Sequence, residues 1–228
     1  MDVIVFEPWK GENYKTGGIF GKKILVIGNS HYCDAKMLEK YPACRKAGRC
    51  LKNCEGCANY TKDAICDHLE GCGHPIYGKI EAMLYRCSGT DKPYKDVWNS
   101  IAYYNYIQQS LVSGSSHAAK DLYDESEQAF WQVLEDLRPS YIIALGKSAM
   151  WTYMSGASWT LESPIEYERE KVNCGIYTLS DGTPIHAIWV LHPSAFGKYH
   201  FCPSYWNHVL NMWFNKKTID FSINQINS

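Results

Sequence analysis

The sequence predicts an α/β fold: a three-layer α/β/α sandwich around a central, mainly parallel four-stranded sheet, with a small Cys-rich metal-binding insertion. Four short segments are continuously apolar and bounded by turn residues, which is typical of strands covered on both faces of a parallel sheet. Helical patterns lie between these segments, and alternating strands and helices favour right-handed crossovers. Six of the ten cysteines fall in one short segment, which indicates the insertion.

The expected elements follow one another along the chain. Strands are expected at Lys23–Gly28, Ser100–Asn105, Tyr141–Gly146 and His186–His192. Helices are expected at Ser126–Leu137, Ser148–Met154 and Tyr205–Phe214. The first helix has apolar residues at helical spacing, and Pro139 ends it.

Length and charge restrict the classes of protein that the chain can represent. Its 228 residues fit one domain, residues 1–228, that contains a Cys-rich insertion at residues 40–76. Lys and Arg number 23 against 24 Asp and Glu, so the net charge of -1 excludes a globally basic nucleic-acid binder and leaves only a local contact with a polyanion. No apolar run reaches the roughly 20 residues of a membrane span, and the N-terminus has no signal pattern. We expect a cytoplasmic monomer without membrane contacts.

Polar residues follow each of the four predicted strands. Ligands bind beyond the carboxyl ends of the strands in sheets of this kind. The residues at these ends are Asn29, Ser30 and His31, then Asn105, then Gly146-Lys147-Ser148, and finally His192-Pro193-Ser194. We therefore expect four strand ends to converge on one crevice.

Four motifs at these strand ends carry a resemblance to a known family. HPSAF, at 192–196, is similar to an HPSPL loop, and VIGNSHY, at 26–32, stands in the place of a water-activating G-Q-D-P-Y-H segment. Tyr103-Tyr104-Asn105 resembles a strand that ends in a base-reading Asn, and ALGKSA, at 144–149, resembles a strand with a Gly-Ser phosphate loop. The chain thus resembles a divergent member of the uracil-DNA glycosylase superfamily over residues 22–214, with the Cys-rich insertion excluded.

The resemblance implies a DNA glycosylase that flips a base out of DNA and hydrolyses its N-glycosidic bond, leaving an abasic site. It implies that His192 stabilises negative charge on the departing base and that Asn105 reads the pyrimidine edge through its amide. Phe196 would fill the vacated stack as an apolar wedge. Phosphate contacts would come from Ser148 and Ser194, with charge added by Lys147.

The chain departs from the family pattern at Ser30, where the well-studied branch has a catalytic Asp. A neutral hydroxyl stabilises a cationic sugar much less than a carboxylate does. Asn29 can position water through its amide carbonyl, and His31, which is absent from the family pattern, is a further candidate. Tyr32 aligns with the aromatic residue that blocks bulky groups at the pyrimidine 5-position. Its placement decides between uracil and a modified pyrimidine, such as a hydroxymethylated or glycosylated cytosine of foreign DNA.

The cysteine segment has the spacing of a metal site. The predicted ligands are Cys44, Cys50, Cys54, Cys57, Cys66 and Cys72. Tetrahedral zinc binds four thiolate or imidazole ligands, and the C-x2-C pair at 54 and 57 is a usual half-site. Zinc is favoured, an iron–sulfur cluster is the alternative, and free thiols are a third possibility. The glycosylase chemistry itself requires no cofactor.

Two other functions compete with the glycosylase. A zinc-bearing protein that binds DNA or recognises damage can retain the flipping pocket without catalysis. An esterase-like hydrolase would use Ser30 as nucleophile and His192 as base. That class expects an Asp three residues before the His, where this chain has Trp189.

Overall fold

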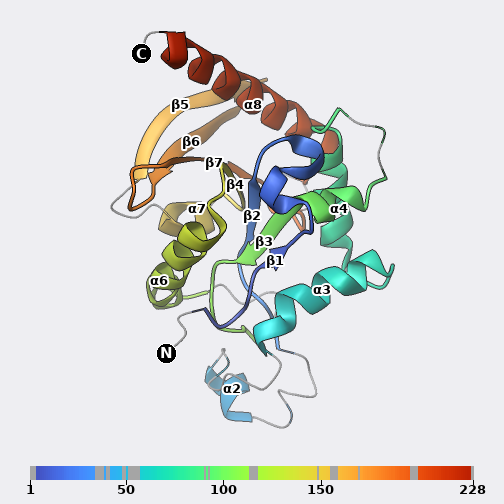
Figure 1. Cartoon of the computed structure of the whole chain (residues 1–228). Helices are drawn as coiled ribbons and strands as arrows, with labels where there is room; N and C mark the ends of the chain where they lie inside the picture. The colour runs from blue at the N-terminus through green and yellow to red at the C-terminus, as the bar shows by residue number, and fades with distance from the viewer. Residues whose placement is uncertain are drawn as a thin grey trace.

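The chain folds into a mixed α/β structure built on one seven-stranded sheet (Figure 1). The computed structural model describes residues 4–33, 39, 42–47, 50, 57–89, 91, 93–112, 118–147, 149–154, 159–168, 170–195 and 200–226. The strand order is β1-β3-β2-β4-β7-β6-β5. None of the helices in these ranges is long and apolar enough to cross a membrane.

The four predicted strands form the parallel centre of the sheet. They are β2 (Ile24–Gly28), β3 (Ile101–Asn105), β4 (Tyr141–Leu145) and β7 (Pro184–Val190). Strand β2 pairs in parallel with both β3 and β4, and β7 pairs in parallel with β4. All residues of β2 and β3 are buried, as continuous apolarity predicts for covered strands. Because the strands run in the same direction, Gly28, Asn105, Leu145 and Val190 end at one edge of the sheet.

The sheet has seven strands, and the prediction of four was wrong. Strand β1 (Trp9–Lys10) pairs antiparallel with β3, and the hairpin of β5 (Trp159–Tyr167) and β6 (Glu170–Thr178) pairs antiparallel with β7. The hairpin strands carry many polar residues, and buried and exposed positions mix along β6. Antiparallel strands can leave one face to solvent, so they lack the continuous apolarity by which the central strands were predicted.

The helices were predicted incompletely. Helices α6 (Lys120–Leu137) and α8 (Pro203–Ile226) are longer than expected, while α7 (Ala149–Met154) agrees within one residue. Between β2 and β3, the described part of the chain contains four further helices, namely α2 (Pro42–Ala47), α3 (Tyr60–Leu69), α4 (Pro75–Tyr85) and α5 (Asp96–Ser100). Short 3-10 helices occur at η1 (Tyr14–Thr16), η2 (Gly18–Phe20) and η3 (Cys57–Asn59). In Figure 1, α6 and α7 lie to one side of the central strands, and α3 and α4 lie to the other.

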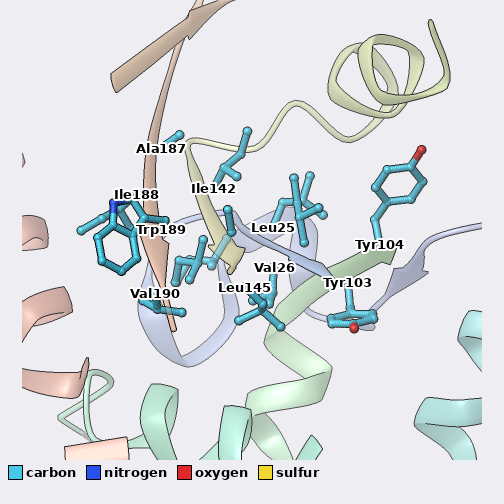
Figure 2. Packing of buried hydrophobic residues seen from close by; sticks show 14 of the residues in the cluster. Leu25, Val26, Tyr103, Tyr104, Ile142, Leu145, Ala187, Ile188, Trp189 and Val190 are labelled. Atoms are coloured by element: carbon cyan, nitrogen blue, oxygen red, sulfur yellow. The ribbon is translucent and has the colours of Figure 1, made fainter. Parts of the chain in front are cut away.

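Helix α3 belongs to the main core, although it falls in the segment expected to form an insertion. Its Ile65 is fully buried in the same hydrophobic cluster as Leu25 of β2 and Ile80 of α4. Figure 2 shows Tyr103 and Tyr104 projecting to opposite sides of β3, as successive residues of a strand do. The ring of Tyr103 makes edge contacts with Tyr77 of α4 and Trp98 of α5. Helices α4 and α5 therefore cover the Tyr103 side of the strand.

Candidate active site

A cavity of about 470 Å³ lies at the edge where the parallel strands end. Seven of the predicted site residues line it: Asn29, Ser30, His31, Tyr32, Asn105, His192 and Ser194. They come from positions up to 165 residues apart in the chain, counting from Asn29 to Ser194. The register of β2 and β3 explains part of this arrangement, because it sets Gly28 beside Asn105. The expected convergence of strand ends thus occurs for β2, β3 and β7.

The side-chain amide of Asn105 is held at both ends. Tyr103 donates its hydroxyl hydrogen to Oδ1 of Asn105 at 3.2 Å. Nδ2 of Asn105 faces the ring of His31, 3.2 Å from Nδ1 and 3.1 Å from Nε2. Nε2 of His31 also lies 2.8 Å from Oγ1 of Thr61 on α3. An amide nitrogen only donates, so the ring nitrogen that accepts this hydrogen carries no proton and the imidazole is neutral. The network fixes which end of the amide is the donor and which the acceptor.

His31 is an internal support of the site. It is 4% exposed and packs against the rings of Phe6 and Tyr60. Burial lowers the pKa of His31 to about 3, because the charged form would lose its hydration. The neutral ring is also the form that can accept from Asn105, so burial and hydrogen bonding favour the same protonation state.

His31 is expected to make the folded chain less stable in acid. Below the ordinary pKa of 6.5, the unfolded chain binds a proton on His31 that the folded chain does not bind. Its stabilising effect is therefore complete above pH 6.5 and is lost as the pH falls toward about 3. We expect this residue to contribute roughly 2 kcal/mol to the loss of unfolding free energy between about pH 6.5 and 4.5.

Urea unfolding of wild type and His31→Gln across this pH range measures the difference. The exposed His208→Gln is the control. If the unfolding free energy of wild type and of His31→Gln changed equally with pH over this range, the expected contribution of His31 would be contradicted.

His192 follows β7 with its imidazole in a defined tautomer. Its Nδ1 accepts from the hydroxyl of Ser194 at 2.6 Å and from the backbone N–H of Ser194 at 3.2 Å. The ring proton is therefore on Nε2, which has no hydrogen-bond partner among the described residues. Burial lowers the pKa of His192, and the nearby charges of His74 and Lys79 lower it further. The ring is kept neutral with one N–H available to a ligand in the cavity.

Asn29 and Ser30 follow β2 in different environments. Oδ1 of Asn29 accepts from the hydroxyl of Tyr123 on α6 at 2.7 Å, and its NH2 group has no hydrogen-bond partner in the described part of the chain. The hydroxyl oxygen of Ser30 is buried and has no hydrogen-bond partner among the described residues. A buried polar atom without a partner is costly unless a ligand or water satisfies it. Both residues can therefore form hydrogen bonds with a molecule that enters the cavity.

A second wall of the cavity comes from residues that the sequence analysis missed. Helices α3 and α4, with the turn between them, contribute Tyr60, Ala64, Asp67, His74 and Tyr77. Residues 60, 64 and 67 lie on one face of α3 at helical spacing, which the sequence alone could have revealed. The cysteine spacing in the same segment pointed instead to a metal-held excursion. The Nζ atom of Lys79 on α4 donates to the carbonyl oxygen of Pro193 at 2.7 Å, which ties this wall to the His192 loop.

Other predicted residues lie elsewhere or outside the described ranges. Lys147 does not line the cavity; its Nζ lies 4.9 Å from the ring centre of Trp189, a cation–π contact. Ser148 and Phe196 lie outside the described residues, so the expected phosphate contact and wedge are predictions only.

The described residues contain no group of three or more His, Cys, Asp or Glu side chains that could hold a metal. Cys54 and the side chain of Cys57 lie outside these residues. Cys44 and Cys50 are buried, whereas Cys66 and Cys72 are exposed. Cys72 lines the cavity described above, and Cys66 lines a different cavity of about 980 Å³ beside Glu7 and Lys62. A shared site for Cys66 and Cys72 therefore gains no support from their positions.

Comparison of the sequence with protein-family models and with curated proteins finds no match for this chain.

Proposed function

We propose that the chain is a DNA glycosylase that flips a uracil or a modified pyrimidine out of DNA and hydrolyses its N-glycosidic bond, leaving an abasic site. One observation carries the proposal: Asn29, Asn105 and His192, which follow or end three different strands, line one cavity of about 470 Å³. The volume lies in the range of small-molecule sites. We also propose that the fold is a three-layer sandwich, with helices covering both faces of the parallel strands. The proposed partner is DNA.

His192 is suited to stabilising a departing base. Negative charge develops on the base when the bond from the sugar carbon C1′ to the base nitrogen breaks, and a fixed donor is worth most in a dry site. The Nε2–H of a neutral imidazole is such a donor, and the two bonds from Ser194 orient the ring. A protonated ring would place a hydrogen on Nδ1 against the backbone N–H of Ser194, which donates to that atom. The lowered pKa of His192 keeps the required form.

Asn105 and Asn29 are suited to reading the base and to holding water. The amide of Asn105 has one hydrogen and one lone pair beyond those used by His31 and Tyr103, and it lines the cavity. Asn29 is oriented by Tyr123 and can bind the attacking water. We propose that Phe196, Ser194, Ser148 and Lys147 contact the DNA around the flipped nucleotide, which would require only a local basic surface.

The test is a panel of labelled oligonucleotides with a single uracil, a thymine mismatch, a hydroxymethylated cytosine or a glycosylated cytosine. Each is incubated with the protein and then treated with alkali, which cleaves abasic sites. We expect strand breaks on at least one substrate and their loss in Asn105→Ala. Absence of breaks on the whole panel would contradict the proposed activity.

A non-catalytic DNA-binding protein is the second candidate, and the amide network favours it. Both ends of Asn105 already have protein partners, and no carboxylate stands at position 30. Tight binding of the oligonucleotides without abasic product would support this function. The esterase gains no support, because Nδ1 of His192 bonds Ser194 and the hydroxyl of Ser30 has no described partner.

We also propose that the Cys-rich segment binds zinc, or alternatively an iron–sulfur cluster. Support comes from the spacing of the cysteines and from the burial of Cys44 and Cys50. Metal analysis of the purified protein decides between the two, and a metal-free protein that is folded would refute both.

A further inference from the structure

Hydrolysis of an N-glycosidic bond sets two electrostatic demands at one site. Electrons move onto the base as the bond breaks, and positive charge develops on the sugar. A hydrogen-bond donor such as His192 stabilises the negative charge on the base. The sugar and the attacking water need a negative or basic group, and the described residues after β2 that line the cavity, Asn29 to Tyr32, include no carboxylate. The residues at the strand ends can therefore stabilise the departing base, but they provide no negative group for the sugar and the attacking water.

A carboxylate is present on the second wall. Asp67 of α3 is the sole Asp or Glu among the described residues that line the cavity. It lies one helical turn beyond Ala64 and two turns beyond Tyr60, on the face of α3 that the cavity shares. Asp67 is exposed, so it is accessible to a substrate that enters the cavity.

The helix that carries Asp67 is firmly placed. The hydroxyl of Tyr60 donates to the backbone oxygen of Tyr32 at 2.8 Å, which ties the start of α3 to the segment after β2. Ile65 is fully buried, and Nε2 of His68 lies 2.8 Å from Oε2 of Glu81 on α4. These contacts involve residues both before and after Asp67 in the sequence. They limit how far the helix can move relative to the strand ends, as a group that acts on a reacting atom requires.

The cavity holds a hydrogen-bond donor and a carboxylate together. His74 and Lys79 act electrostatically on His192 and favour its neutral form. Lys79 also bonds the carbonyl oxygen of Pro193, next to His192. His192 and Asp67 line the same cavity, so the group that the base requires and the group that the sugar and the water require are both present in it.

We infer that Asp67 is a catalytic residue that supplies from α3 the carboxylate that position 30 lacks, an inference that rests on the proposed glycosylase function. The bond between C1′ and the base nitrogen breaks, and its electron pair leaves with the base, which His192 stabilises. Water adds to C1′, and Asp67 accepts the proton that the water loses. The base takes up a proton from solvent, so the products are the free base and an abasic sugar.

The experiment measures single-turnover base release and DNA affinity for wild type, Asp67→Asn and Asp63→Asn. Asp63 lies on the same helix, is exposed and does not line the cavity, so it is a matched control for charge and helix propensity. We expect Asp67→Asn to lower the rate about 10²-fold or more with DNA affinity changed less than about threefold. Asp63→Asn should behave as wild type.

The outcomes separate this inference from the proposed function. If wild type releases a base and Asp67→Asn does so at a similar rate, the role of Asp67 is overturned and the glycosylase stands. A parallel loss of rate and affinity in Asp67→Asn also overturns the role and assigns Asp67 to binding. If wild type releases no base from any oligonucleotide of the panel, both are overturned.

Discussion

Replacement of His192 by alanine is expected to slow base release about 10²- to 10³-fold, the usual effect of removing one fixed donor to a developing oxyanion. The physical reason is the Nε2–H, which the two bonds from Ser194 to Nδ1 keep in place. Single-turnover assays on the best oligonucleotide of the panel measure the rate. DNA affinity, measured separately, should change little, because the donor matters most when charge develops on the base.

Two further variants make the His192 result specific. Ser194→Ala removes the 2.6 Å bond to Nδ1 and leaves the imidazole, so we expect a smaller loss, on the order of tenfold. His208→Ala changes an exposed histidine of α8 that does not line the cavity, and it should retain the wild-type rate. Because the pKa of His192 is lowered, the wild-type rate should hold below the ordinary histidine range and fall only in stronger acid. A His192→Ala protein with more than a tenth of the wild-type rate would refute the role.

The sequence allowed prediction of the parallel strands and of the residues at their ends, because both follow from local patterns. Continuous apolarity marks a strand covered on both faces, and the parallel arrangement brings Asn29, Asn105 and His192 to one edge. The hairpin of β5 and β6 was missed because its strands mix buried and exposed residues without a long apolar run. The mixture is a tertiary property, set by which face meets the core.

The second wall of the cavity was missed for a different reason. Tyr60, Ala64 and Asp67 repeat at helical spacing, but cysteines in the same segment suggested a metal-held excursion. The hydrogen bonds that join His31 to Asn105 and to Thr61 link three remote parts of the chain. No periodicity within one segment predicts such a network, since it exists only after the strand ends and α3 are packed together.

Gly28 is the residue whose replacement tests this packing most directly. It ends β2 beside Asn105, and a methyl group on its Cα would place a carbon 2.1 Å from Oδ1 of Asn105 and 2.2 Å from the hydroxyl oxygen of Tyr103. Neither side chain can move away easily. Asn105 is 3% exposed and bonded to His31, while the ring of Tyr103 is held between Tyr77 and Trp98.

Gly28→Ala is therefore expected to lower the unfolding free energy by about 1 to 3 kcal/mol, the usual cost of overpacking a core. It should also lower base release at least about 10²-fold, because the amide of Asn105 loses its orientation. Gly78→Ala is the matched control. Gly78 is exposed in helix α4, its added methyl would lie 3.8 Å from His68, and alanine there should raise stability by about 1 kcal/mol. Urea unfolding and single-turnover rates of both variants measure these effects. A stable and active Gly28→Ala protein would show that Asn105 is not held where the site requires it.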